Sequence, residues 1–194
     1  MDTAIKYQYQ PLLESDAIQL LELKPSLDIN AQVECSLISS TFRACDHDLI
    51  EHYTALSYVW GDAQEQKTIL VDGRALSITV NLDTALRHLR DPTRKRLIWA
   101  DAICINQSNS REKNHQVVQM AKIYQDALHT IIFLGESTPE SNLVMDTLRD
   151  ATYEILSGEG IGDLPWDSLF NRPWFTRVWV FQELTLSRDP WCVE

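Results

Sequence analysis

The stretch LIWADAICI, from Leu97 to Ile105, decides the fold class, because it is apolar at almost every position. A strand at the surface of a sheet alternates apolar with polar side chains, whereas a continuous apolar run is typical of a strand buried on both faces of a parallel sheet. One acid, Asp101, interrupts the run and needs hydrogen-bond donors inside the protein. Two interpretations of Asp101 stay open: it orients a loop or caps a helix, or it faces a ligand.

Predicted strands and helices alternate around this run. Residues Tyr53–Trp60 and Thr130–Leu134 are rich in aromatic and β-branched side chains and predict two further strands. The spacing of apolar residues predicts helices over Arg111–Ala127, Leu143–Leu156 and Trp174–Leu186. This alternation predicts an α/β domain in which helices flank a mainly parallel sheet.

The first part of the chain is predicted to add antiparallel strands to that sheet. Asp72-Gly73 separates two apolar runs, which is a strong hairpin signal because the tight turn needs positive φ angles. Asn81 then resembles a cap for a helix over Leu82–Leu89. The strand candidates are Ala17–Leu23, Val33–Ile38, Thr68–Val71 and Ala75–Ile78.

The composition is that of a globular protein and disfavours several functional classes. Of the 194 residues, 44% are hydrophobic and 23% are charged, which suits one folded domain. A formal net charge of −11 disfavours nucleic-acid binding, and the basic run Arg94–Arg96 is expected to be a solvated turn. The cysteines form no Cys-x-x-Cys pair, no signal peptide is evident and no apolar run could span a bilayer, so we expect a cytoplasmic protein without membrane contact. No zinc-ligand spacing is present, so no metal site is predicted.

Three polar turns at the ends of predicted strands are expected to meet, because ligand sites in such sheets lie beyond the carboxyl ends of the strands. Turn formation by itself also explains Asp62 and Asn106, and their expected convergence is what makes them candidates. The three turns are Trp60-Gly61-Asp62, Cys104-Ile105-Asn106-Gln107 and Leu134-Gly135-Glu136.

Glu183 is the best single candidate for a site residue. On a helical wheel of Trp174–Leu186, apolar side chains point in almost every direction, which predicts a buried helix. Glu183 shares the one narrow polar strip with Thr176 and must be paired, hydrogen-bonded or shifted in pKa. The pattern favours equally a site acid and a structural ion pair with Arg172 or Arg177.

The common catalytic fingerprints are absent. The sequence has no Gly-x-Ser-x-Gly elbow, no Gly-x-Gly-x-x-Gly or Walker loop and no His-Glu-x-x-His helix. These absences disfavour the commonest hydrolases, dehydrogenases, nucleotide triphosphatases and metalloproteases.

Three long motifs, in order and with fitting spacing, resemble the fungal heterokaryon incompatibility (HET) domain family. They are Tyr53–Asp62, Ile98–Gln107 (continuing through Arg111-Glu112, Met120, Tyr124, Ala127 and Leu134-Gly135) and Arg172–Leu184. The resemblance implies a cytoplasmic fungal protein of allorecognition and regulated cell death. It implies one HET domain over residues 1–194, with a β-rich extension at 1–50 and an α/β core at 51–194. In that family the domain is an effector on a longer chain that also carries a sensor region.

A more distant resemblance, to TIR domains, implies a mechanism and a flavodoxin-like sheet. Leu56–Asp62 is similar to the first TIR motif and makes Ser57, Tyr58, Trp60, Gly61 and Asp62 candidates for substrate binding. Trp179–Leu184 is similar to the TIR motif Trp-Cys-x-x-Glu-Leu, with Val180 in place of the cysteine.

The second TIR-like motif implies that Glu183 is the catalytic acid of NAD cleavage. Trp60 or Trp179 would then stack on a ring, with Asp101 and Asn106 as further substrate-binding candidates. NAD would be the substrate, and no cofactor or metal is needed. The alternative is a non-catalytic module that self-associates and recruits a death effector; in both cases a homo-oligomer is expected on activation. A nucleotide-binding module without turnover has no fingerprint in its favour.

Overall fold

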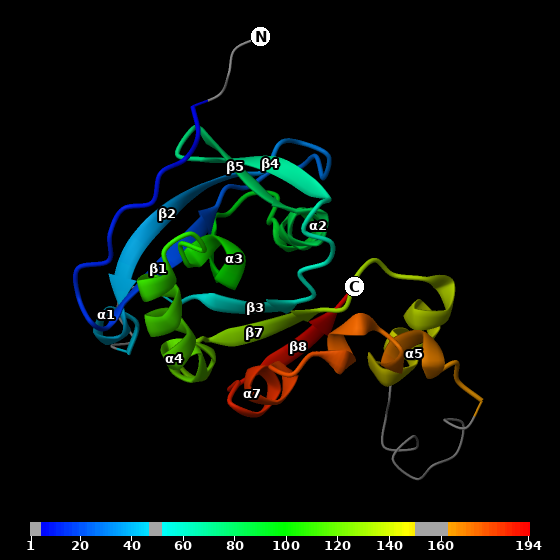
Figure 1. Ribbon diagram of the computed structural model, residues 1–194. Helices are drawn as coiled ribbons and strands as arrows, with labels where there is room; N and C mark the ends of the chain where they lie inside the picture. Colours follow the sequence, from blue (N-terminus) through cyan, green and yellow to red (C-terminus); the bar gives the residue numbers. More distant parts are fainter. Residues whose placement is uncertain (1–4, 47–51, 150–162) are drawn as a thin grey trace.

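The structure, a computed structural model, describes residues 5–46, 52–149 and 163–194. These residues form one eight-stranded mixed sheet with helices on both sides, in the strand order β5-β4-β2-β1-β6-β3-β7-β8 (Figure 1). The strands are β1 (Ala17–Leu23), β2 (Glu34–Thr41), β3 (Thr54–Tyr58), β4 (Gln66–Val71), β5 (Arg74–Thr79), β6 (Arg96–Trp99), β7 (His129–Phe133) and β8 (Pro190–Val193). The expected α/β class is confirmed.

The parallel half of the sheet consists of β6, β3, β7 and β8. In chain order these are the second, first, third and fourth strands, which is the arrangement of flavodoxin-like sheets. Four of the seven strand pairings among the described residues are parallel, as expected for a mainly parallel sheet. The carboxyl ends of these four strands point the same way and define the edge at which a site can form.

The antiparallel half confirms the expected N-terminal addition. Strand β1 pairs antiparallel with β2 along its whole length and with β6 on its other side, so it joins the two halves. Strands β4 and β5 form the predicted hairpin, with Asp72 at φ 50° and Gly73 at φ 74° in the turn. The positive φ angles are those that this tight turn demands, which explains the Asp-Gly pair.

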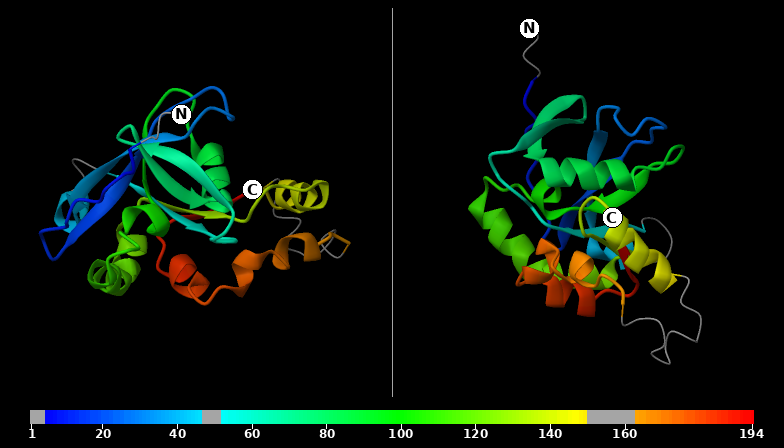
Figure 2. Two further views of the ribbon diagram at one scale, coloured as in Figure 1. Left: turned by 45° about the horizontal axis from the view of Figure 1, so that its top comes forward. Right: turned by 90° about the vertical axis from the view of Figure 1, so that its right-hand side faces the viewer.

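Helices cover both sides of the sheet. Helices α4 and α7 contact each other on one side of the parallel strands, and α2 lies on the other (Figure 2). The helices are α1 (Phe42–Asp46), α2 (Val80–Leu89), α3 (Asp101–Cys104), α4 (Ser110–Asp126), α5 (Pro139–Arg149), α6 (Asp167–Phe170), α7 (Val180–Thr185) and the 3-10 helix η2 (Pro173–Thr176).

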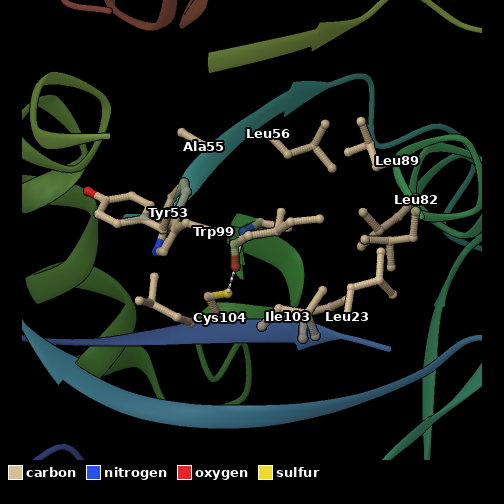
Figure 3. Packing of buried hydrophobic residues seen from close by; sticks show 14 of the residues in the cluster. Leu23, Tyr53, Ala55, Leu56, Leu82, Leu89, Trp99, Ile103 and Cys104 are labelled. Atoms are coloured by element: carbon tan, nitrogen blue, oxygen red, sulfur yellow. Dashed lines mark hydrogen bonds between the residues drawn. The ribbon is translucent and has the colours of Figure 1, made fainter. Parts of the chain in front are cut away.

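The main hydrophobic core lies between β1, β3 and α2. Leu23, Leu56 and Leu82 converge there around the fully buried Trp99 (Figure 3). The Trp99 ring meets Tyr124 of α4 edge to face at 5.8 Å between ring centroids. Residues of the N-terminal strands and of the parallel half therefore share one core.

The prediction of a strand along the whole of LIWADAICI is wrong. Strand β6 ends at Trp99, and Asp101–Cys104 forms the short helix α3, in which the amides of Ile103 and Cys104 bond to the carbonyl of Ala100. Ile103 and Cys104 are fully buried, as in a core strand. A short helix inside the core is as apolar as a buried strand, so hydrophobicity alone cannot distinguish them.

The predicted continuous helix Trp174–Leu186 is also wrong. The chain forms η2, becomes extended at Arg177 with φ −76° and ψ 141°, and only then enters α7. Most of the apolar side chains on this segment face outward: Val178 is 89% exposed and Phe181 is 75% exposed. The apolar composition therefore does not reflect burial, although Glu183 itself is buried.

Two other helix predictions change in detail. Asn81 does not cap α2, which begins at Val80; its Nδ2 instead donates to the Val59 carbonyl at 3.2 Å. The predicted helix Leu143–Leu156 begins earlier, at Pro139, and is described to Arg149. The rest of that predicted range lies outside the described residues. Helix α4 is capped by Asn109, whose side chain accepts from the amides of Arg111 and Glu112.

Gly61, just after β3, leaves room for a neighbouring side chain. Comparing Gly61→Ala with Gly73→Ala tests this steric role. Both have positive φ, 77° and 74°, but a Cβ on Gly61 would lie 2.7 Å from Asn81 Nδ2, whereas one on Gly73 would meet nothing within 4 Å. We expect Gly73→Ala to lower the free energy of unfolding by roughly 1 kcal/mol, and Gly61→Ala by clearly more because of the added clash. Urea denaturation followed by circular dichroism measures both. Equal losses would show that Asn81 moves aside without cost.

Candidate functional site

Glu183 lies at the centre of a buried polar cluster beneath α7. Its side chain is 1% exposed. Arg177 binds it with both terminal nitrogens: Nη1 donates to Oε2 and Nη2 to Oε1, each at 2.8 Å. This bidentate geometry is the strongest form of an arginine–carboxylate contact. Of the two ion-pair partners proposed from the sequence, Arg177 is therefore the partner.

Ser57 connects this ion pair to the central strand β3. Its hydroxyl donates to Glu183 Oε2 and accepts the indole N–H of Trp174 at 2.6 Å. Ser57, Trp174 and Glu183 are all buried, so each of these groups depends on the others for its hydrogen bonds. The chain Trp174–Ser57–Glu183 fixes the carboxylate against the sheet.

Arg172 serves another part of the fold. Its guanidinium donates to the carbonyls of Ser168 and Glu136 at 3.0 Å and 2.9 Å, and lies 3.0 Å from the carboxylate of Glu194. It thereby joins the loop after β7 to the end of β8.

A cleft of about 300 Å³ is lined by Arg177 but not by Glu183. Trp60 and Trp179, 39% and 43% exposed, present two aromatic rings to it. Lys113 of α4 adds a second cation beside Arg177. The cleft is lined by Trp60, Asp101, Ile105, Gln107, Lys113, Val117, Met120, Arg177 and Trp179.

Asp101 follows β6 and occupies the first position of α3, at the wall of this cleft. Its Oδ2 accepts the indole N–H of Trp60 at 2.9 Å, and its Oδ1 accepts the amide of Ala102 at 2.8 Å. Burial raises the pKa of the Asp101 carboxyl above its usual value, while the bond from Trp60, the nearby Tyr58 hydroxyl and the charge of Arg177 act in the opposite direction. Burial and the neighbouring Asp101 also raise the pKa of Tyr58.

The structure brings most of the sequence candidates together. Ser57 and Glu183 form the buried cluster, Trp60, Asp101 and Trp179 line the cleft, and Tyr58 lies beside Asp101. Both hypotheses for Asp101 keep support. Its bond to Trp60 fits a role in orienting local structure, and its place in the cleft lining fits a ligand-facing role. Trp60, which follows β3, and Asp101, which follows β6, therefore meet at the carboxyl ends of these strands, as expected.

Asp62, Asn106 and Gly61 do not line the cleft. Asp62 is exposed and its Oδ1 accepts the amide of Gln64 at 2.8 Å, which makes a local turn. Asn106 Oδ1 accepts from the amide and hydroxyl of Ser108 at 3.2 Å and 2.7 Å in another turn. Gly61 packs against Asn81. The turn interpretation suffices for the positions of Asp62 and Asn106.

Sequence reasoning missed Trp174 and Lys113, and named Gln107 only as part of the turn Cys104–Gln107. Trp174 looked like one more apolar residue of a buried helix, and only the fold brings its indole N–H to Ser57. Gln107, whose Nε2 donates to the Asp101 carbonyl at 2.8 Å, lies in a turn that had been singled out for its neighbour Asn106. Lys113 reaches the cleft from the first turns of α4, and no local sequence signal marks it.

The residues that the structure describes hold no group of three or more His, Cys, Asp or Glu side chains placed to bind a metal ion. Burial raises the pKa of the Cys104 thiol to about 12, so this side chain is a buried thiol rather than a nucleophile. Among the same residues no helix has the length and apolarity that a bilayer crossing requires. The chemistry available at the cleft is that of carboxylates, cations and aromatic rings.

The fold and site define an α/β protein with a ligand-sized cleft at the carboxyl edge of its parallel strands. Within that class, the sequence pattern of the heterokaryon incompatibility protein (HET) family matches residues 53–183. The chain belongs to the HET family. The matched range contains every side chain of the buried cluster and of the cleft.

Two curated fungal proteins are similar to this chain. Heterokaryon incompatibility protein 6, OR allele, of Neurospora crassa is 30% identical over 237 aligned residues, which cover 94% of this chain and 34% of that protein. Vegetative incompatibility protein HET-E-1 of Podospora anserina is 32% identical over 144 residues, covering 70% of this chain and 9% of that protein. The chain thus spans about a third or less of their lengths. A comparison with solved structures finds no significant match.

Ser57→Ala tests the buried hydrogen-bond chain. The change leaves the Trp174 indole N–H without its acceptor and removes one donor from Glu183. We expect the free energy of unfolding to fall by about 2 kcal/mol, because a buried unsatisfied group costs about that much. Urea denaturation measures it. Ser40→Ala is the matched control: Ser40 is also buried in a strand, but its Oγ makes a weak hydrogen bond with Cys45 Sγ at 3.7 Å. Similar losses in both variants would contradict a special role for Ser57.

Asp101→Asn tests the cost of the charge beside the cleft. A raised pKa means that the folded protein holds the proton more tightly, so stability falls as the pH rises from about 3.8 through the folded-state pKa. The amide carries no charge and keeps one oxygen that can accept from Trp60, whereas its Nδ2 cannot accept the amide of Ala102. We expect the fall in stability as the pH rises from about 3.8 to be absent in the variant, because the charge that burial penalises is gone. Thermal unfolding at several pH values measures it, with exposed Asp62→Asn as the charge control.

Proposed function

We propose that this chain is the effector part of an incompatibility protein and triggers cell death by cleaving NAD or a related nucleotide. Family membership and the two named relatives support the role in fungal incompatibility. The observation that carries the mechanism is a single carboxylate, Glu183, held rigidly behind a cleft with two aromatic rings. The similarity of Trp179–Leu184 to the TIR motif gives that carboxylate a role.

The reaction would be hydrolysis of the N-glycosidic bond of NAD. The bond between the ribose carbon and nicotinamide breaks, and nicotinamide leaves with the electron pair. The ribose then carries an oxocarbenium-like positive charge, which the negative charge of Glu183 stabilises. Water adds to the ribose carbon and releases one proton, so the products are nicotinamide and ADP-ribose. No metal or redox partner takes part.

The cleft has the chemistry to hold such a substrate. Its volume of about 300 Å³ is at the small end of ordinary ligand pockets, which suits one ring with its attached ribose. Trp60 and Trp179 can stack on that ring. Lys113 and Arg177 supply positive charge for the phosphates in a chain whose formal net charge is −11. These are the residues that would select a nucleotide.

A second candidate function is a non-catalytic module that self-associates and recruits a death effector. The exposed apolar side chains of Val178 and Phe181 favour it, because large exposed apolar side chains gathered in one segment mark interaction surfaces. On this hypothesis Glu183 and Arg177 form only a structural ion pair. Both hypotheses place the protein in the cytoplasm, with homo-oligomer formation and a sensor region controlling activation.

Glu183→Gln separates the two functions. We expect the wild-type protein, at high concentration, to release nicotinamide from NAD, and the variant to release it at least about 100-fold more slowly, because the amide lacks the stabilising charge. Release is measured by chromatography, with circular dichroism to confirm folding. The matched control, exposed Glu65→Gln, should retain full turnover.

Undiminished turnover in folded Glu183→Gln would reject the catalytic assignment. The recruiting module would be supported instead if the wild-type protein killed cells without consuming NAD and the Glu183→Gln variant killed them equally well.

A further inference from the structure

Arg177 connects Glu183 to the cleft, because it pairs with the carboxylate and also lines the cleft. Glu183 is 1% exposed and does not line the cleft, whereas Arg177 does. Both terminal nitrogens of Arg177 are occupied by the carboxylate. A ligand in the cleft therefore contacts Arg177 but not Glu183 as long as the ion pair persists.

The guanidinium is also the group in the cleft best suited to bind a phosphate. A phosphate offers the same pair of oxygens as a carboxylate, and a phosphate monoester or a diphosphate carries more negative charge, so it competes for a bidentate arginine. Lys113 lines the same cleft and adds attraction for that charge. An uncharged ligand offers the guanidinium no such exchange and leaves the ion pair in place.

Glu183 would stay in position if Arg177 changed partner. Ser57 still donates to Oε2, and Trp174 still holds Ser57. The carboxylate would thus keep a neutral donor from β3 and lose only the cation that covers it. Arg177 itself is the C-cap of η2: its backbone angles are extended, and its amide donates to the Trp174 carbonyl at 3.2 Å. Its side chain can turn toward the cleft without breaking a helix.

We propose that Arg177 is an exchangeable anion receptor. In the unliganded protein it pairs with Glu183. When a ring-bearing ligand binds, its phosphate replaces Glu183 as the partner of Arg177 and so frees the carboxylate. Arg177 thereby determines specificity for phosphate-bearing ligands over the corresponding nucleosides. Trp60 and Trp179 hold the ring in this arrangement. The binding part of the proposal is independent of turnover; its catalytic consequence rests on the proposed cleavage of NAD.

The test compares AMP with adenosine as ligands of the purified chain, by isothermal titration calorimetry. We expect wild-type protein to bind AMP roughly 10 to 100-fold more tightly than adenosine, the range of one or two charge-assisted hydrogen bonds. In the double variant Arg177→Gln/Glu183→Gln this preference should fall to the part that Lys113 supplies. The double change replaces the buried charges by two amides, so no unpaired carboxylate is left, and circular dichroism checks its folding. Exposed Arg74→Gln removes an equal charge elsewhere and should change nothing.

Glu183→Gln alone tests the exchange. If phosphate must displace the carboxylate, weakening the ion pair makes Arg177 more available, so the variant should bind AMP several-fold more tightly and adenosine unchanged. Weaker or unchanged AMP binding by this variant overturns the exchange. Equal affinity of the wild type for both ligands, or no binding of either, overturns the proposal as a whole.

A turnover assay then separates this proposal from the proposed function. Wild-type protein should release nicotinamide from NAD at least about tenfold faster than from nicotinamide riboside, which has no phosphate to displace Glu183. Equal rates contradict the exchange. No release from either compound, together with phosphate-dependent binding of AMP, rejects NAD cleavage and leaves the role of Arg177 standing.

Discussion

The buried ion pair of Glu183 and Arg177 is the interaction on which the carboxyl edge of the sheet depends. A carboxylate that is 1% exposed is costly unless it is paired and hydrogen-bonded, and here Arg177 and Ser57 supply the donors. Because Ser57 belongs to β3 and Glu183 to α7, the pair joins the last helix to the central strand. Trp174 adds the fourth member from η2. Segments more than a hundred residues apart in the chain are held together by one polar cluster.

The sheet topology places the cleft next to this cluster. Strand β3 is central in the parallel half, and the chain passes from it to β6 on one side and later to β7 on the other. The carboxyl end of β3 carries Trp60, and the residues after β6 carry Asp101. A bond between these two side chains forms one wall of the cleft, while Arg177 and Trp179 close it from the connection between η2 and α7. With Lys113, Val117 and Met120 of α4, the site depends on four separate segments that meet only in the fold.

The sequence predicted elements well where pattern and turn chemistry agreed. Strand β1 runs from Ala17 to Leu23, as predicted, and the Asp72-Gly73 hairpin has the positive φ angles that its residues imply. The two failures came from apolar runs without a clear period. In LIWADAICI the first residues belong to strand β6 and the later ones form the short helix α3. In Pro173–Thr185 the helical conformation is interrupted at Arg177. Apolar composition measures hydrophobicity but gives neither the backbone conformation nor the side that faces the core.

What the sequence by itself determined is the class of fold, the family, and the identity of Glu183 as an acid that needs partners. Local periodicity, turn residues and long motifs are properties of neighbouring residues, so they can be recognised without the fold. Only the tertiary structure decided that Arg177 rather than Arg172 pairs with Glu183, and that Ser57 and Trp174 complete the cluster. It also decided that Asp62 and Asn106 stay outside the cleft. The physical reason is that hydrogen bonds and ion pairs act over a few ångströms, and the folded sheet, not the sequence order, sets which groups come within that distance.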